Sequence, residues 1–171
     1  MEIRFDEQVA IVTGAGRGLG RAHAIAMASK GAKVVVNDFS GSQEISENAN
    51  SVVEEIISAG GEAITNGANV ANFDQVQCMV NETIDKWGRV DILVNNAGIL
   101  RDKTFLKMSV EDMREVIDVH LMGSLNCSKA VWEIMREQSY GRIVLTSSSS
   151  GLYGNFGQTN YGAAKMAMVG I

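Results

Sequence analysis

The chain has 171 residues, enough for one domain with a substantial core, and its formal net charge is −5. Acidic and basic residues are spread along it without a basic run, which argues against nucleic acid and anionic membrane surfaces as partners. No apolar run reaches bilayer-spanning length, and the two cysteines and two histidines lack the spacing of metal ligands, so we predict neither a membrane span nor a metal site.

Apolar runs of strand length alternate with longer helical stretches along the whole chain. This alternation is typical of an α/β fold in which a doubly wound parallel sheet, the Rossmann arrangement, carries helices on both faces. No linker or repeat interrupts it, so we expect residues 1–171 to form a single domain. The expected strands are 8–13, 33–37, 62–65, 90–95 and 142–147, and the expected helices are 18–30, 43–59, 73–87, 110–137 and 160 onward.

The first strand leads directly into a glycine-rich turn. Val9–Thr13 reads as a short buried strand, residues 14–20 hold four glycines, and a helical stretch continues from Arg21. A strand, a glycine turn and a helix start together present backbone N–H groups and a positive helix end to a pyrophosphate. An ordinary tight turn between strand and helix is the alternative interpretation.

The second strand ends at Asp38, eighteen residues after Gly20. That spacing is close to the ~20 residues expected for an acid that binds the adenosine ribose hydroxyls of a dinucleotide. A carboxylate there accepts two hydroxyl hydrogen bonds and repels a 2′-phosphate, so the sequence favours NAD over NADP. Two alternatives remain: Arg17 could bind a 2′-phosphate, and Asp38 could be a solvated acid at a strand end.

Polar or glycine residues follow the carboxyl ends of the expected strands, the edge at which open α/β sheets bind ligands. Asn95 and Asn96 are adjacent amides that close an apolar strand, and we expect them to cross-link neighbouring strands and line the ligand cleft. The residues at this edge are Gly14, Asp38, Asn69, Asn95 and Ser148.

Tyr161 and Lys165 are four residues apart, which places the phenol and the ammonium on one face of a helix. A cation beside a phenol favours the phenolate, which can then exchange protons with an alcohol or a carbonyl. Ser148, from a neighbouring loop, can hold the substrate oxygen. The Y-x-x-x-K pattern alone is weak, because chance produces it often.

These motifs together resemble the short-chain dehydrogenase/reductase family, and the resemblance covers essentially the whole chain. The family's T-G-x-x-x-G-x-G turn is present from Thr13 to Gly20, its N-N-A-G segment is 95–98, and its serine, tyrosine and lysine match Ser148, Tyr161 and Lys165. The resemblance implies that Tyr161 is the general base for alcohol oxidation, that Lys165 supports it and holds the nicotinamide ribose, and that Ser148 stabilises the reacting oxygen. It implies NAD binding by Gly14, Arg17, Gly18, Leu19, Gly20, Asp38, Asn69, Val70, Asn95, Ala97, Gly98, Tyr161 and Lys165.

Residues 4–6, 98–103, 119–124 and 150–158 are similar to a narrower group, the dehydrogenase units of type 2 peroxisomal multifunctional enzymes. This similarity implies NAD-dependent oxidation of (3R)-hydroxyacyl-CoA to 3-ketoacyl-CoA in fatty-acid β-oxidation, with an acyl-CoA-type substrate. It also implies a peroxisomal location in a eukaryote and a cytoplasmic one otherwise. Family members pair through the helices expected at 110–137 and 160 onward, so we expect a homodimer or larger homo-oligomer.

Two positions depart from the family pattern. His120 stands where most members have an asparagine that carries a proton relay to the lysine; it either extends the proton path or packs without a role in it. Asn69-Val70 stands where the family usually has an aspartate near adenine, and an asparagine can still donate and accept hydrogen bonds.

The family's unit is longer than this chain, so the resemblance implies a fold that is incomplete at the C-terminus and lacks its C-terminal third. Two other functions therefore remain open. One is a 3-oxoacyl thioester or ketone reductase of the same family, and the other is a non-catalytic, truncated nucleotide-binding module.

Overall fold

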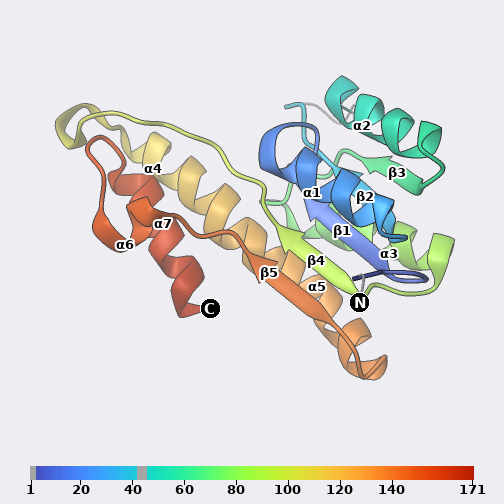
Figure 1. Cartoon of the computed structure of the whole chain (residues 1–171). Helices are drawn as coiled ribbons and strands as arrows, with labels where there is room; N and C mark the ends of the chain where they lie inside the picture. The colour runs from blue at the N-terminus through green and yellow to red at the C-terminus, as the bar shows by residue number, and fades with distance from the viewer. Residues whose placement is uncertain (1–2, 42–45) are drawn as a thin grey trace.

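A computed structural model describes residues 3–41 and 46–171 of the chain (Figure 1). Its centre is a parallel sheet of five strands in the order β3-β2-β1-β4-β5, which confirms the doubly wound α/β fold. The strands are β1 (Val9–Thr13), β2 (Lys33–Asn37), β3 (Glu62–Asn66), β4 (Ile92–Asn95) and β5 (Arg142–Leu145). The helices are α1 (Gly18–Ser29), α2 (Glu47–Ser58), α3 (Phe73–Trp87), α4 (Val110–Ile117), α5 (Gly123–Glu137), α6 (Ser149–Tyr153) and α7 (Thr159–Gly170), with a 3₁₀ turn at Phe105–Lys107.

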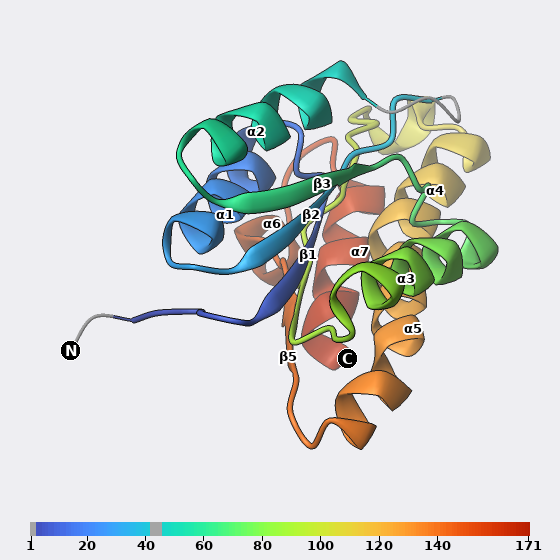
Figure 2. The same ribbon diagram turned by 90° about the vertical axis from the view of Figure 1, so that its right-hand side faces the viewer.

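Two apolar layers sandwich the sheet, because successive residues of a strand point to opposite faces. From β1, Ala10 and Val12 pack toward α1 and α2, whereas Ile11 packs toward α3 and α5. Figure 2 shows α1 and α2 on one side of the sheet and α3 and α5 on the other. The central strands are hydrophobic on both faces, as is typical of parallel sheets covered by helices.

Strand register brings the carboxyl ends of β1, β2 and β4 to one edge. Thr13 pairs with Asn37 across β1 and β2, and Val12 pairs with Val94 across β1 and β4. The glycine turn, Asp38 and the Asn95-Asn96 pair therefore leave the sheet at the same edge, although they are far apart in sequence.

The segment expected to form a helix at 110–137 is helical throughout, but it is not an α-helix over its whole length. A π-helical segment, Asp118–Met122, separates α4 from α5 and contains His120. The extra residue in a π turn shifts the face that each helix presents, and such turns occur often at functional sites. α5 begins at Gly123. A Cβ on this residue would lie 2.7 Å from Val70 Cγ2, so the helix approaches the loop after β3 closely.

Other element boundaries also differ from expectation. The short helix α6 was not predicted, because its run of serines reads as a loop. In the expected helix 43–59, residues 43–45 lie outside the described part of the chain, and α2 begins at Glu47 with Ser46 in extended conformation. In the described ranges no helix combines the length and apolar composition that a membrane crossing requires.

Candidate nucleotide-binding and catalytic site

The glycine turn is built around two residues with left-handed backbone conformation. Gly14 has φ +60° and Gly18 has φ +57°, a region that favours glycine. A Cβ on Gly14 would lie 2.8 Å from Ala97 Cα, so glycine lets the turn approach the loop after β4. Arg17, the N-cap residue of α1, makes no capping bond with its side chain, and the first turn of α1 has no acidic residue. This helix start fits a pyrophosphate.

Thr13 and Asn96 fasten the glycine turn to the loop after β4. Thr13 Oγ1 accepts hydrogen bonds from the backbone N–H groups of Asn96 and Ala97, each 3.0 Å long. Asn96 Nδ2 donates to the carbonyls of Thr13 and Gly14 at 2.9 and 3.0 Å. These bonds are the expected cross-link between neighbouring strands. Asn95 instead donates to Ser128 Oγ on α5 over 3.2 Å.

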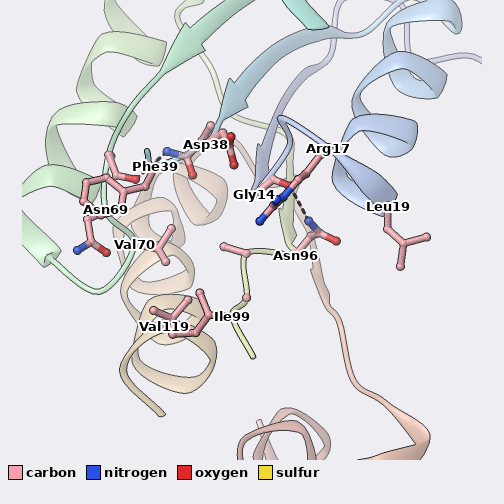
Figure 3. A pocket seen from close by; sticks show the side chains of 14 residues that line it. Gly14, Arg17, Leu19, Asp38, Phe39, Asn69, Val70, Asn96, Ile99 and Val119 are labelled. Carbon is pink, nitrogen blue, oxygen red and sulfur yellow. Dashed lines mark hydrogen bonds between the residues drawn. The ribbon is translucent and has the colours of Figure 1, made fainter. Parts of the chain in front are cut away.

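A cavity of about 360 Å³ lies at this edge of the sheet (Figure 3). Eight of the residues expected to bind the cofactor line it; Gly18, Gly20, Asn95, Tyr161 and Lys165 do not. The eight are Gly14, Arg17, Leu19, Asp38, Asn69, Val70, Ala97 and Gly98.

Sequence reasoning missed several apolar members of the cavity wall. Phe39, Ile99 and Val119 lie there with the predicted residues, and Figure 3 places Ile99 beside Val119. Phe39 and Ile99 directly follow the predicted Asp38 and Gly98 and could have been inferred by adjacency. Val119 comes from the π-helical segment, and although residues 119–124 carry the narrower resemblance, nothing in the sequence indicated that Val119 lines the cavity.

The Asn69-Val70 segment is fixed by the helices on either side of it. Asn69 Oδ1 accepts from the N–H of Ala71 at 3.0 Å, and the Asn69 N–H donates to Gln75 Oε1 at 2.8 Å. The carbonyl of Val70 accepts from Asn126 Nδ2 of α5 at 3.0 Å. Hydrogen bonds to α3 and α5 therefore hold this loop in place.

Lys165 is a nearly fully buried ammonium group beside Tyr161. The residue is 4% exposed, its Nζ donates to the Thr146 carbonyl at 2.6 Å, and the same Nζ lies 5.7 Å from the centroid of the Tyr161 ring. Burial lowers the pKa of Lys165 to about 8. The expected one-turn spacing thus places the two groups close together.

Residues next to Ser148 hold it against α7, the helix that carries Tyr161 and Lys165. It is the N-cap residue of α6, where its Oγ accepts from the Ser150 N–H at 3.2 Å. Ser147 Oγ donates to the carbonyl of Lys165 at 2.7 Å, and a Cβ on Gly151 would lie 2.8 Å from the Lys165 backbone. The structure therefore holds α6 directly against α7 (Figure 1).

His120 connects the cavity with the Tyr161 helix. Its Nε2 lies 2.9 Å from the Ile99 carbonyl oxygen and 3.0 Å from the Ile99 nitrogen, and its ring meets Tyr161 edge to face with centroids 5.3 Å apart. Burial lowers the pKa of His120, against the opposing effect of the Ile99 hydrogen bond, so the imidazole is neutral near pH 7. His120 Nδ1 is buried and has no hydrogen-bond partner among the described residues.

Asn160 is a further residue that the sequence did not reveal. It is 3% exposed, its Oδ1 accepts from the Tyr161 N–H at 2.8 Å, and its Nδ2 donates to the carbonyls of Arg101 and Asp112 at 3.2 and 3.3 Å. The start of α7 is thereby tied to α4 and to the loop after β4.

In the described ranges, no cluster of His, Cys, Asp or Glu side chains is arranged to hold a metal ion.

The chain matches one protein family and is similar in sequence to several known proteins. The family model described as short chain dehydrogenase matches residues 8–171. A peroxisomal multifunctional enzyme type 2 from Drosophila melanogaster is 51% identical over 174 residues, which cover 99% of this chain and 29% of that protein. A 3-oxoacyl-acyl-carrier-protein reductase from Synechocystis is also 51% identical, over 96% of this chain and 65% of that protein.

Among solved structures, a 7α-hydroxysteroid dehydrogenase in complex with NADH and 7-oxo glycochenodeoxycholic acid superposes with a TM-score of 0.89. It is 34% identical, and the match covers 96% of this chain and 62% of that one. The chain thus spans less than two thirds of the length of each of these three proteins.

Proposed function

Because the chain belongs to the short-chain dehydrogenase family, we propose that it carries the nucleotide-binding and catalytic residues of an NAD-dependent oxidation of a secondary alcohol. The proposed reaction is (3R)-hydroxyacyl-CoA to 3-ketoacyl-CoA. The observation that carries the proposal is the buried Lys165 ammonium 5.7 Å from the Tyr161 ring. An ammonium kept out of water interacts more strongly with charge that develops at a neighbouring hydroxyl than one in solvent.

Each catalytic side chain has a separate part in the proposed chemistry. Tyr161 takes the hydroxyl proton of the alcohol, and the Lys165 ammonium beside it supports this transfer and holds the nicotinamide ribose. Ser148 donates a hydrogen bond to the reacting oxygen. A bound nicotinamide supplies the hydride acceptor. His120, neutral and in contact with both Ile99 and Tyr161, extends the route by which the proton leaves.

NAD is the proposed cofactor because Asp38 lines the cavity at the end of β2. A carboxylate at this position accepts hydrogen bonds from ribose hydroxyls and repels a 2′-phosphate. Calorimetric titration of the chain with NADH and with NADPH tests this proposal. Tighter binding of NADH, lost in Asp38→Asn, is the expected result; equal affinities in the wild type would contradict it.

The proposed substrate class rests on the relatives named as peroxisomal multifunctional enzymes. Assays that compare (3R)- with (3S)-hydroxyacyl-CoA, and CoA thioesters with carrier-protein thioesters, test it. Preference for the (3R)-CoA thioester is expected.

For a eukaryotic host we propose the peroxisome as the compartment, and for a bacterial one the cytoplasm.

Tyr161→Phe tests the catalytic assignment. Loss of the phenolic oxygen removes the proposed general base, so we expect the rate of alcohol oxidation to fall by about a thousandfold, within the usual range for general acid–base groups. Urea unfolding of the variant, compared with that of the wild type, serves as the control for folding. Oxidation at the wild-type rate would exclude this role for Tyr161.

Reduction of a 3-oxoacyl thioester is the second candidate function. Two observations favour it: the Synechocystis relative is named as such a reductase, and Arg17 lines the cavity where a 2′-phosphate could reach it. Faster turnover of a 3-oxoacyl carrier-protein thioester with NADPH than of a hydroxyacyl-CoA with NAD would establish this alternative.

A further inference from the structure

Ser46 occupies the N-cap position of α2, but its hydroxyl is used elsewhere. A serine at this position ordinarily accepts a hydrogen bond from an N–H group in the first helical turn. Ser46 makes no capping bond with its side chain. Instead its Oγ donates to Asp38 Oδ2 over 2.8 Å, and the residue is 4% exposed. The start of α2 thus gives up a side-chain cap, and the hydroxyl holds the carboxylate at the end of β2.

Gly16 confines the same carboxylate from the glycine turn. A Cβ on Gly16 would lie 2.7 Å from Asp38 Cγ and closer still to Oδ2, inside van der Waals contact. It would also lie 2.8 Å from Asn48 Cβ on α2. The absence of a side chain at Gly16 therefore lets the carboxylate and the first turn of α2 close on the glycine turn.

From these contacts we infer that Ser46 is a positioning residue which, together with the bare Cα of Gly16, fixes the orientation of the Asp38 carboxylate and so strengthens discrimination between NADH and NADPH. The inference rests on the proposed role of Asp38. An ionised carboxylate has about four acceptor sites, so the bond from Ser46 leaves sites for two ribose hydroxyls.

A fixed carboxylate affects the two nucleotides in opposite ways. For NADH, the acceptor is already oriented, so less conformational freedom is lost on binding. For NADPH, the 2′-phosphate meets a negative charge that cannot rotate away from it. Both effects raise the ratio of the NADPH dissociation constant to the NADH dissociation constant, whereas a general loss of stability changes both constants alike.

The test is calorimetric titration of the whole chain and its variants with NADH and with NADPH. Ser46→Ala is expected to lower the discrimination ratio by about fivefold, the equivalent of one ordinary hydrogen bond. Gly16→Ala, which pushes the carboxylate from the other side, is expected to lower it as well. Ser46→Thr keeps a hydroxyl and is expected to retain the wild-type ratio.

Ser109→Ala is the matched control. Ser109 is the N-cap residue of α4, and its Oγ does accept a hydrogen bond from the Asp112 N–H, at 3.0 Å. Its loss is expected to lower stability and leave the ratio unchanged. If Ser46→Ala does not fold, Gly16→Ala decides the question.

Two outcomes would overturn the inference and separate it from the proposed function. An unchanged ratio in both Ser46→Ala and Gly16→Ala, with a lower ratio in Asp38→Asn, shows that Asp38 selects the nucleotide without help from Ser46. An unchanged ratio in Asp38→Asn as well removes the proposed basis of the NAD preference, and the inference fails with it.

Discussion

At Lys165, burial and hydrogen bonding act on one ammonium group in opposite directions. The Thr146 carbonyl accepts from its Nζ, yet the loss of water around the charge dominates and the pKa falls to about 8. Burial of the charged Lys165 side chain therefore lowers the free energy of unfolding at neutral pH. A charge kept buried at such a cost is typical of functional sites.

The free energy of unfolding provides a test of this cost. The folded pKa of Lys165 is about 8 against an ordinary value of 10.5, so between these values the unfolded chain binds more protons than the native chain. The free energy of unfolding therefore rises with pH between these two values. Below the lower value, the whole cost of burying the charged Lys165 is present. Urea unfolding at pH 7 and pH 10 should show wild type gaining stability relative to Lys165→Met. A difference that does not change with pH would contradict the assignment.

Residues within sequence motifs could be predicted, whereas residues defined by tertiary contacts could not. Tyr161 and Lys165 follow from one helical turn, and Asp38 follows from its distance to the glycine turn. Asn160 acts by bonding Arg101 and Asp112, some fifty residues away, and no local pattern encodes such a pairing. Ser46 lies inside the helix expected at 43–59, and only the structure shows that it precedes α2 and that its hydroxyl bonds to Asp38.

At the scale of elements, the π-helical segment is the main feature that the sequence did not predict. Residues 110–137 contain apolar positions at helical spacing and no proline, so they read as one helix. A single extra residue in one turn leaves that pattern almost intact. Its effect is visible only in packing, where His120 lies beneath Gly98 and beside Tyr161.

Gly98 allows this packing, and its substitution tests it. A Cβ on Gly98 would lie 3.0 Å from both ring nitrogens of His120 and nearer to the carbon between them. Gly98→Ala must displace the buried ring or lift the loop, so we expect a loss of about 2 kcal/mol in the free energy of unfolding. The measurement is urea denaturation.

Gly170→Ala is the control for this substitution, because a Cβ there would have no neighbour within 4 Å. A slight gain in stability is expected, since alanine favours helix over glycine. Equal effects at the two glycines would show that His120 does not need the space above it.

At the scale of the whole molecule, apolar side chains remain exposed on two helices. Leu125 and Trp132, two turns apart on α5, are 38% and 63% exposed, and Met166 and Val169 on α7 are 51% and 56% exposed. We propose that these helices pair with a second copy of the chain. The strand order β3-β2-β1-β4-β5 leaves both helices near the β5 edge (Figure 1).

Sedimentation at micromolar concentration tests the pairing. A species of twice the chain mass is expected, and Trp132→Lys should shift it toward the monomer, because the ammonium would have to be desolvated in the interface. Tyr153→Lys alters an exposed aromatic residue on α6 and should leave the mass unchanged. A wild-type monomer would exclude the proposed dimer.

The difference between β5 and the other central strands has a consequence for amide hydrogen exchange. β1, β2 and β4 are buried along almost their whole length, whereas every residue of β5 is at least partly exposed. Local opening therefore requires less free energy at β5 than at the strands behind the cavity. Amide protons of β5 are consequently expected to exchange faster than those of β1, β2 and β4.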